Sequence, residues 1–261
     1  MSFRESFVSV CVSVGHIVDL FFQVVTRLHH IWKRRESTAS QLYGSSIAVL
    51  HVVLLVGFFI GMVVSLQTGI ELSSIGQQDQ IGTIVTVSMA REMGPFITGI
   101  ILAATVGSAM AAELGTMAVS EELAALEVLS VDRVSFLVVP RLTALAIMCP
   151  LLTVFCDAVG VIGGGFVAEA QLNVGLELYY DSAISALQTP TEFLALPKDV
   201  YSGLFKSFVF GVIVACIACS EGLRARGGAL GVGNATRQAV RDSIIWIIIS
   251  NYFMTLFFYQ S

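Results

Sequence analysis

The chain has 261 residues, of which 56% are hydrophobic and only 13% are charged. A soluble domain of this size is about one quarter charged, so the composition excludes an ordinary soluble protein and predicts an integral membrane protein. The net charge of −5 carries little information, because orientation in a membrane depends on where the charges lie rather than on their sum. The five cysteines fall in or beside apolar runs, which argues against a disulfide framework.

The first predicted element is an amphipathic helix over Phe7–Leu28. Its polar residues recur at spacings of three and four, so they form one narrow stripe on an otherwise apolar helix. This pattern favours a helix that lies in the membrane interface, with a sixth spanning helix as the alternative. The basic cluster Lys33-Arg34-Arg35 follows and favours the cytoplasmic side. Residues 1–45 are therefore predicted to be an interfacial helix with a basic linker, ahead of a membrane domain over residues 46–261.

Five stretches are long and apolar enough to cross a hydrocarbon core of about 30 Å, which takes roughly 20 helical residues. They are Ser46–Gln67, Pro95–Leu114, Ser135–Phe166, Tyr201–Ser220 and Asp242–Tyr259. The third stretch is longer and contains two prolines, so we expect it to be tilted or kinked and to extend beyond the bilayer. Ile81–Ala90 is too short to cross alone, and we expect it to extend the second helix.

The distribution of Lys and Arg supports five crossings with the amino terminus inside. This count places Arg133 and the arginines of residues 224–241 on the cytoplasmic side. Residues 167–200, which carry five acidic side chains against Lys198 alone, then lie outside. A separate crossing by Ile81–Ala90 would reverse every later loop and break the agreement with the positive-inside rule.

Small residues recur every four positions along three of the predicted spans. These stripes are Gly57 and Gly61, then Ala103, Gly107, Ala111 and Gly115, then Gly160 and Gly164. Small residues at this spacing let helix backbones approach closely in lipid, so they predict a tight helix bundle. Packing within one chain explains them at least as well as a seam between two chains.

A short acidic helix is predicted between the second and third spans, at residues 121–129. Ser120 is its expected N-cap, and Glu121 and Glu122 suit the positive end of the helix dipole. The apolar positions Leu123, Leu126, Val128 and Leu129 are expected to form a ridge beside the acids, which include Glu127. Such a ridge favours docking into a groove on a partner, with an ordinary interfacial loop helix as the alternative.

Ionisable groups in or at the edge of apolar runs are costly in a membrane and indicate function. Arg91 and Glu92 stand before the second span, where an ion pair on the outer surface is the structural alternative. Asp157 lies within the third span, and it could instead hydrogen-bond an unwound, glycine-rich end near residues 163–165. The glycine-rich basic stretch 224–237 is expected to be a cytoplasmic loop that rests on lipid head groups or a partner.

The sequence offers no sign of catalysis by the chain itself. The glycine-rich stretch lacks the G-K-[ST] that a nucleotide-binding loop needs, and no other stretch supplies an ATP site. The four histidines are not spaced as metal ligands, and no nucleophile–base pair is evident. We therefore expect a protein that is not an enzyme and that holds neither a cofactor nor a metal.

Several blocks of the sequence resemble the MlaE/YrbE permease family. The blocks are R-E-M-G-P, V-G-S-A-M-A-A-E-L-G-T-M, S-E-E-L-A-A-L-E-V-L, F-L-V-V-P-R-L, P-L-L-T-V-F-C-D-A-V-G-V-I-G-G and G-L-R-A-R-G-G-A-L-G-V-G-N-A-T-R-Q-A-V. They occur in the family's order from about Gly61 to the carboxyl terminus, whereas the amino-terminal helix fits in character only. The resemblance identifies residues 46–261 as an MlaE-type permease domain.

The resemblance implies the membrane subunit of an ABC-type transporter, a multi-pass protein of the bacterial inner membrane. Such a transporter moves phospholipid between that membrane and a periplasmic path to the outer membrane. In this family two permease copies form a homodimer, and each docks on a separate ATPase subunit that is MlaF-like. An MCE-domain protein that is MlaD-like continues the lipid path, and a STAS-domain protein can bind the ATPase. No nucleic acid is expected, and a chloroplast envelope is the alternative location.

The resemblance also assigns roles to particular residues. The segment that matches the coupling helix to the ATPase contains Glu121, Glu122, Leu126, Glu127 and Leu129. Arg91 and Glu92 match the family's R-E-[LM]-G-P near the outer mouth of the lipid cavity, and Leu66 and Gln67 are expected contacts near the outer end of the first span. The competing function is a secondary transporter or channel driven by an ion gradient. No inverted repeat is visible, and five spans do not divide into two equal halves, which argues against it.

Overall fold

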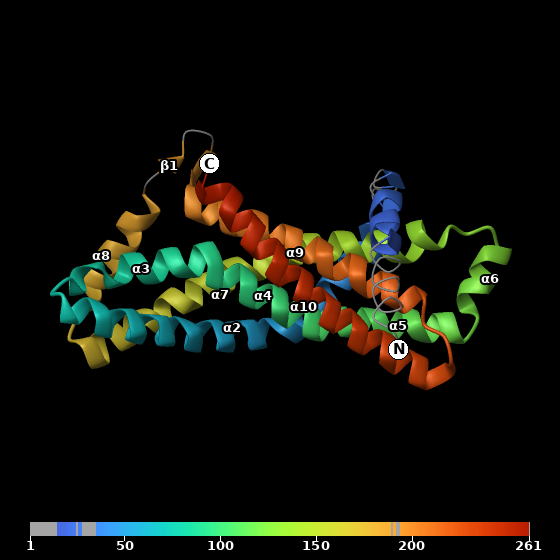
Figure 1. The fold of residues 1–261 in the computed structure, drawn as a ribbon, viewed down its shortest axis with the longest axis horizontal. Coiled ribbons are helices and arrows are strands. Elements are labelled where there is room, and N and C mark those ends of the chain that lie inside the picture. The colour runs from blue at the N-terminus through green and yellow to red at the C-terminus, as the bar shows by residue number, and fades with distance from the viewer. Residues whose placement is uncertain (1–14, 25, 28–34, 189, 192–193, 261) are drawn as a thin grey trace, which may run out of the picture. The chain divides into compact units, whose positions relative to one another are not determined.

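The computed structural model describes residues 15–24, 26, 27, 35–188, 190, 191 and 194–260. The described residues 15–24, 26 and 27 are helical and form what we call the N-terminal helix. The helices that follow are α2 (Arg35–Ser74), α3 (Ile81–Ser88), α4 (Gly94–Leu102), α5 (Ser108–Val119), α6 (Glu122–Val128), α7 (Val139–Leu172), α8 (Leu176–Leu187), α9 (Lys198–Leu223) and α10 (Gly228–Gln260) (Figure 1). Two short strands, β1 (Pro190–Thr191) and β2 (Leu194–Pro197), pair antiparallel before α9.

Five helical stretches of the described chain are long and apolar enough to cross a membrane. They are Val49–Ser74, Gln78–Val119, Val134–Leu172, Lys198–Leu223 and Gly228–Tyr259. The chain is therefore an all-α membrane protein, and the predicted number of spans is confirmed. The second span begins before Ile81, so the prediction that residues 81–90 extend the second helix is also confirmed. Phe7–Val14, Leu28 and the basic residues Lys33 and Arg34 lie outside the described residues.

The second span is continuous but contains wider helical turns. One π-helical turn, η3 (Met89–Met93), joins α3 to α4, and a second, η4 (Ala103–Gly107), joins α4 to α5. A third, η5 (Val134–Val138), precedes α7. Single π-turns inside α-helices occur frequently at functional sites. Arg91 and Glu92 lie in η3, so they sit inside the second span rather than at its start.

The fold divides into two compact units, each made from three stretches of chain. Unit 1 contains the described part of Met1–Ser45 together with Leu102–Ile147 and Gly211–Ile247. Unit 2 contains Ser46–Ile101, Met148–Phe210 and Ile248–Ser261. Arg133 and the arginines of residues 224–241, which are expected on the cytoplasmic side, all belong to unit 1. Residues 167–200, which are expected outside, belong to unit 2.

In unit 2, α2 and α7 cross with their backbones in close approach. A Cβ atom added to Gly61 would lie 1.8 Å from the carbonyl oxygen of Gly160, and one added to Gly57 would lie 2.9 Å from the carbonyl oxygen of Cys156. The Ser65 hydroxyl donates a hydrogen bond of 2.8 Å to the Gly164 carbonyl, which ties the same two helices together. These small residues therefore serve packing within the chain, as close helix pairs in lipid require.

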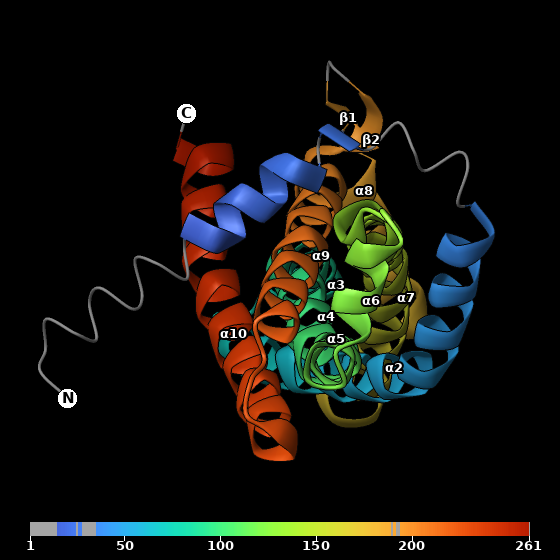
Figure 2. The same ribbon diagram turned by 90° about the vertical axis from the view of Figure 1, so that its right-hand side faces the viewer.

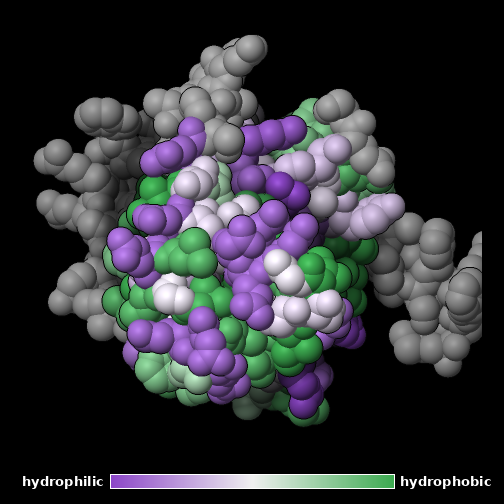
Figure 3. All heavy atoms as spheres, turned by 90° about the vertical axis from the view of Figure 1, so that its left-hand side faces the viewer, coloured by the Kyte–Doolittle hydropathy of each residue, from purple (hydrophilic) through white to green (hydrophobic). Residues whose placement is uncertain are grey.

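Unit 2 also packs α8 against α3, at the end shown in Figure 3. The Thr83 hydroxyl donates to the Ser182 carbonyl over 3.0 Å, and the fully buried Tyr179 donates from its hydroxyl to the Val161 carbonyl over 3.0 Å. Burial raises the pKa of the Tyr179 phenol, so it remains a neutral donor. Hydrophilic side chains gather on this end among hydrophobic ones (Figure 3), as a water-facing end of a membrane protein requires.

In unit 1, the small-residue stripe of the second span packs against α9 and the turn after it. Gly107 faces Val214, and Gly115 faces Ala225, at distances that leave no room for a larger side chain without a shift. Ala103 and Ala111 are fully buried. The buried Arg141 of α7 contacts Glu113 of α5 over 3.0 Å. Packing within the chain accounts for this stripe as well.

Two interpretations of the sequence, an alternative role for Asp157 and a loop over residues 224–237, were wrong. The helix α7 is continuous to Leu172, so no unwound glycine-rich end exists for Asp157, whose Oδ1 finds no hydrogen-bond partner among the described residues and faces the Cα of Gly94. Residues 224–237 are not mainly a loop, because α10 already begins at Gly228. The chain reverses over Arg224–Gly227, helped by positive φ angles at Gly227 and Gly228 that favour glycine.

Candidate functional site

Arg91 and Glu92 line a pocket of about 610 Å³ in unit 2, which we call the outer pocket. The other lining residues come from α4 and α10, namely Phe96, Ile248, Asn251, Tyr252, Thr255 and Tyr259. One wall is therefore charged and polar, and another is aromatic and aliphatic. A pocket of this kind suits an amphiphile, because polar groups fix the orientation of a ligand and apolar walls hold its body.

Glu92 is the centre of a buried polar network in this pocket. Its Oε1 lies 2.6 Å from Nζ of Lys206 on α9 and 2.9 Å from the Thr255 hydroxyl, and its Oε2 accepts a hydrogen bond of 3.0 Å from Asn251. The Lys206 side chain is fully buried, and its Nζ also donates to Thr255 and to the carbonyl oxygen of Arg91. A buried ammonium is tolerated in a membrane span only when it is paired and hydrogen-bonded, as it is here.

Arg91 belongs to a second network and does not pair with its neighbour Glu92. Its guanidinium contacts Oδ1 of Asp199 through two nitrogens, at 2.8 and 3.0 Å, and lies over the ring of Tyr259 at 4.1 Å from the centroid. The Tyr259 hydroxyl donates to the same Asp199 oxygen over 2.8 Å. An arginine that both stacks on a ring and bonds a carboxylate is held in one orientation. The structural alternative, an ion pair between Arg91 and Glu92 on the outer surface, is therefore wrong, because each residue pairs separately with a residue of α9.

Sequence reasoning missed the residues that complete these networks, which are Asp199, Lys206, Asn251, Thr255 and Tyr259. The position of Lys206 could have indicated a functional residue, because it is a charged residue inside an apolar run. Asn251 and Thr255 are polar residues one helical turn apart in the last span, but nothing in the sequence relates them to a motif some 160 positions away. Their role follows only from the way α10 packs near η3 in unit 2.

The four residues predicted to contact lipid are not brought together. Arg91 and Glu92 line the outer pocket, whereas Leu66 and Gln67 lie on α2 and do not line it. Leu66 is half-buried and Gln67 is exposed.

The predicted coupling segment forms the helix α6, which follows α5 at one end of unit 1 (Figure 2). The prediction that Ser120 caps this helix was wrong. Glu121 adopts a left-handed conformation with φ of 62° and occupies the N-cap position of α6 itself. The Ser120 hydroxyl instead bonds the Thr116 carbonyl and Oε1 of Glu122, each over 2.9 Å, so Ser120 closes α5.

The surface of α6 carries exposed acids beside exposed apolar side chains. Glu121, Glu122 and Glu127 are exposed, and Val128 and Leu129 are 85% and 71% exposed. Leu123 is buried and Leu126 is half-buried, so this part of the expected apolar ridge anchors α6. The other part of the ridge, Val128 and Leu129, is exposed to solvent. Glu127 also forms an ion pair of 2.8 Å with Arg133. Large apolar side chains left in solvent next to charges are typical of a docking surface.

Comparison with known proteins places the chain among permeases. A profile of the family described as Permease MlaE matches residues 38–257. A probable ABC transporter permease protein of Synechocystis is 38% identical over 263 residues, covering 100% of this chain and 97% of that protein. A probable ABC transporter permease protein of Rickettsia bellii is 40% identical over 211 residues, covering 81% of this chain and 78% of that protein.

A plant protein is similar over most of the chain as well. The chloroplastic protein TRIGALACTOSYLDIACYLGLYCEROL 1 of Arabidopsis thaliana is 37% identical over 238 residues, which cover 91% of this chain and 66% of the plant protein. The family match and these identities agree with the resemblance carried by R-E-M-G-P and the other sequence blocks. The chain belongs to the MlaE permease family of ABC transporter permeases.

Proposed function

We propose that this chain is the membrane subunit of an ABC transporter that moves phospholipid between the bacterial inner membrane and a periplasmic path to the outer membrane. The observation that carries the proposal is the outer pocket, which combines the ionic groups of Arg91 and Glu92 with the apolar walls of Phe96, Ile248 and Tyr252. A phospholipid needs polar contacts for its head group and apolar contacts for its acyl chains, and the pocket offers both.

Family membership supports the energy source and the class of substrate. An ABC transporter permease works with an ATPase, and we propose a separate MlaF-like subunit for this role. The name of the plant relative is that of a glycerolipid, which agrees with a lipid substrate. We propose further that two copies of the chain form a homodimer, that an MlaD-like MCE-domain protein continues the path outside, and that a STAS-domain protein binds the ATPase.

The surface of α6 supports the proposed coupling. Its exposed acids Glu121 and Glu122 and its exposed apolar residues Val128 and Leu129 offer both charge and apolar area to a partner groove. Leu123 is buried and anchors α6 in unit 1, so force on the outer face would be transmitted to the helices that follow. ATP binding would thereby change the shape of the cavity that holds the lipid.

Charge reversal on α6 tests this function. The complex of the chain with its ATPase is reconstituted in vesicles, and ATP hydrolysis and transfer of a fluorescent phospholipid are measured together. Glu121→Lys with Glu122→Lys should abolish ATP-dependent transfer, while the purified chain keeps its thermal stability because both side chains are exposed. Glu71→Lys with Asp79→Lys makes the same charge change at exposed positions of unit 2 and should leave coupling intact.

The outcomes separate the competing functions. Normal transfer by the Glu121→Lys, Glu122→Lys variant would disprove the coupling role of α6. Transfer that continues without ATP and follows an ion gradient would instead establish a secondary transporter. Fractionation of the native membranes tests the location of the protein. A transporter of the bacterial inner membrane and one of the chloroplast envelope would each be found in fractions that contain the marker lipids of their own membrane.

A further inference from the structure

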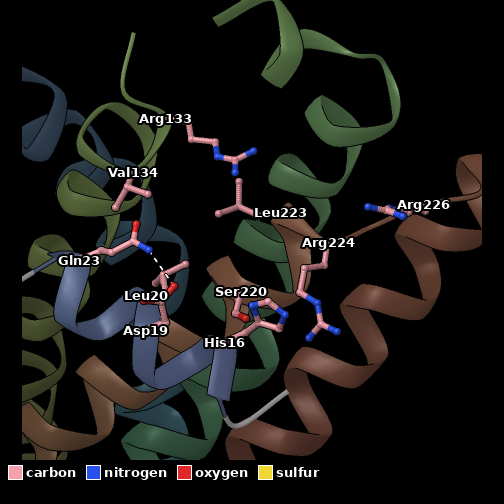
Figure 4. Close-up of a pocket in the computed structure, with 10 residues that line it drawn as sticks. All are labelled: His16, Asp19, Leu20, Gln23, Arg133, Val134, Ser220, Leu223, Arg224 and Arg226. Carbon is pink, nitrogen blue, oxygen red and sulfur yellow. Dashed lines mark hydrogen bonds between the residues drawn. The ribbon is translucent and has the colours of Figure 1, made fainter. Parts of the chain in front are cut away.

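Unit 1 contains a second pocket, of about 600 Å³, which shares no residue with the outer pocket. We call it the basic pocket. Three segments line it: the N-terminal helix, the start of η5, and the end of α9 with the turn that follows (Figure 4). The ionisable residues of its lining are His16, Asp19, Arg133, Arg224 and Arg226. Asp19 and Gln23 lie on one side, and Arg224 and Arg226 lie on the other (Figure 4).

Positive charge dominates this lining. It includes three arginines and a single carboxylate, Asp19, which accepts a hydrogen bond of 2.8 Å from Gln23. Arg133 is paired with Glu127 outside the pocket, and Arg224 lies 3.8 Å from the carboxylate of the largely buried Glu221. Arg226 is exposed and forms no ion pair with any residue that the structure describes. The lining of the pocket therefore carries three guanidinium groups against one carboxylate, so its net charge is positive.

The N-terminal helix brings an apolar surface to the same place. Leu20 and Val24 are buried against unit 1, and Arg27 holds the helix through an ion pair of 2.7 Å with Asp132. Val18 and Phe22, on other faces of the helix, are 47% and 62% exposed. A helix that buries one apolar side and exposes another next to a polar pocket is built to lie in a membrane interface.

We propose that the basic pocket binds the phosphate of an anionic phospholipid from the adjacent leaflet. Guanidinium groups bond phosphate oxygens in pairs, and this match is stronger than the match of an ammonium group. The polar atoms of His16, Gln23 and Ser220 can complete the hydrogen bonds of the head group. The acyl chains would run along the exposed Phe22 side of the N-terminal helix, which a free phosphate would leave uncovered.

The bound lipid would have a positioning role. It would join the N-terminal helix to the turn at Arg224–Gly227 across the basic pocket. This lipid is distinct from the transported one, since the two pockets share no residue. The inference therefore does not depend on the proposed transport function, and it is tested without any transport assay.

The probe is phosphatidylglycerol, titrated into the delipidated full-length chain in a mild detergent and counted by native mass spectrometry. Phosphatidylcholine, which has a phosphate but no net charge, is titrated in parallel. We expect Arg224→Gln with Arg226→Gln to weaken phosphatidylglycerol binding by about tenfold or more, the equivalent of one charge-assisted hydrogen bond. The control is Arg237→Gln, which removes an exposed arginine that bonds Asn234 and lines neither pocket.

The results decide between sources of the phosphate and between kinds of ligand. Preference for phosphatidylglycerol that is lost in the double variant and kept in Arg237→Gln supports the proposal. Equal binding of phosphatidylglycerol by the wild type and the double variant overturns it.

Three further outcomes concern other ligands and folding. Inorganic phosphate that displaces the lipid at matched concentration would show a soluble ligand instead. Loss of a co-purifying acidic protein with unchanged lipid binding would show a protein interface. If the double variant does not fold, equal affinity of the wild type for the two lipids overturns the proposal by itself.

Discussion

Replacing Lys206 by methionine tests whether the outer pocket depends on its buried ion pair. The Lys206 side chain is fully buried and donates to the Glu92 carboxylate, the Thr255 hydroxyl and the Arg91 carbonyl. Methionine keeps most of the apolar stem, so the change removes the charge and three hydrogen bonds and creates little empty space. The Glu92 carboxylate is then left with Thr255 and Asn251 as partners.

The expected cost follows from the burial of the two partners. Removing one member of a buried ion pair costs about 3–5 kcal/mol, because the remaining charge is left unpaired in a medium of low dielectric constant. Glu92 is 26% exposed and keeps two hydrogen-bond donors, which places the cost at the lower end, near about 3 kcal/mol. The double variant Lys206→Met, Glu92→Met removes both charges and should lie within about 1 kcal/mol of the wild type.

Unfolding in mixed micelles, followed as a function of the mole fraction of SDS, measures these free energies. Lys198→Met is the matched control, since Lys198 is the other lysine of α9 and is exposed. It should change stability by less than about 1 kcal/mol. Equal losses in Lys206→Met and in the double variant would refute the reasoning, because the cost would then come from packing rather than from an unpaired carboxylate.

Two further substitutions probe the helix crossing and the second polar network. Gly61→Ala places a Cβ 1.8 Å from the Gly160 carbonyl oxygen, so we expect a loss of about 2 kcal/mol in unfolding free energy. The control Gly233→Ala lies inside α10 and meets nothing within 4 Å, so it should cost nothing and should stabilise the protein by up to about 1 kcal/mol. A stable Gly61→Ala protein would show that the crossing is looser than described. Arg91→Lys keeps the charge but loses the paired bonds to Asp199 and the stacking on Tyr259, so lipid transfer should fall about tenfold. Lipid transfer at the wild-type rate would show that the paired bonds and the stacking of Arg91 have no role in transport.

The number of spans could be predicted because bilayer thickness imposes a length on each apolar run. The ends of the helices could not be predicted in this way, and the start of α10 illustrates the reason. Each glycine in a helix interior costs about 1 kcal/mol, so the glycine-rich stretch 224–237 favoured a loop. The structure continues α10 back to Gly228, because propagation from a long apolar helix and packing of Ala235 and Ala239 in unit 1 outweigh that local preference.

The capping of α6 could not be predicted for a related reason. Serine is a preferred N-cap residue and acidic side chains suit the first turn of a helix, and Ser120 with the glutamates that follow it fits that pattern. Instead, α5 ends at Val119, and the left-handed conformation of Glu121 turns the chain into α6, which begins at Glu122. The Ser120 hydroxyl then lies closest to the helix that precedes it. The local sequence could not reveal whether Ser120 caps α6 or bonds to α5, because this depends on how α5 and α6 pack.

The outer pocket shows most clearly what a sequence motif leaves out. Arg91 and Glu92 are adjacent, yet their partners Asp199 and Lys206 stand seven residues apart on α9, about 10 Å along its axis. Two long side chains can reach both partners only if α9 comes close to the backbone of η3. Gly203 allows that approach, because a Cβ there would lie 1.9 Å from the Ala90 carbonyl oxygen. The two ion pairs therefore depend on a glycine placed between their partners, a dependence that no single block of sequence expresses.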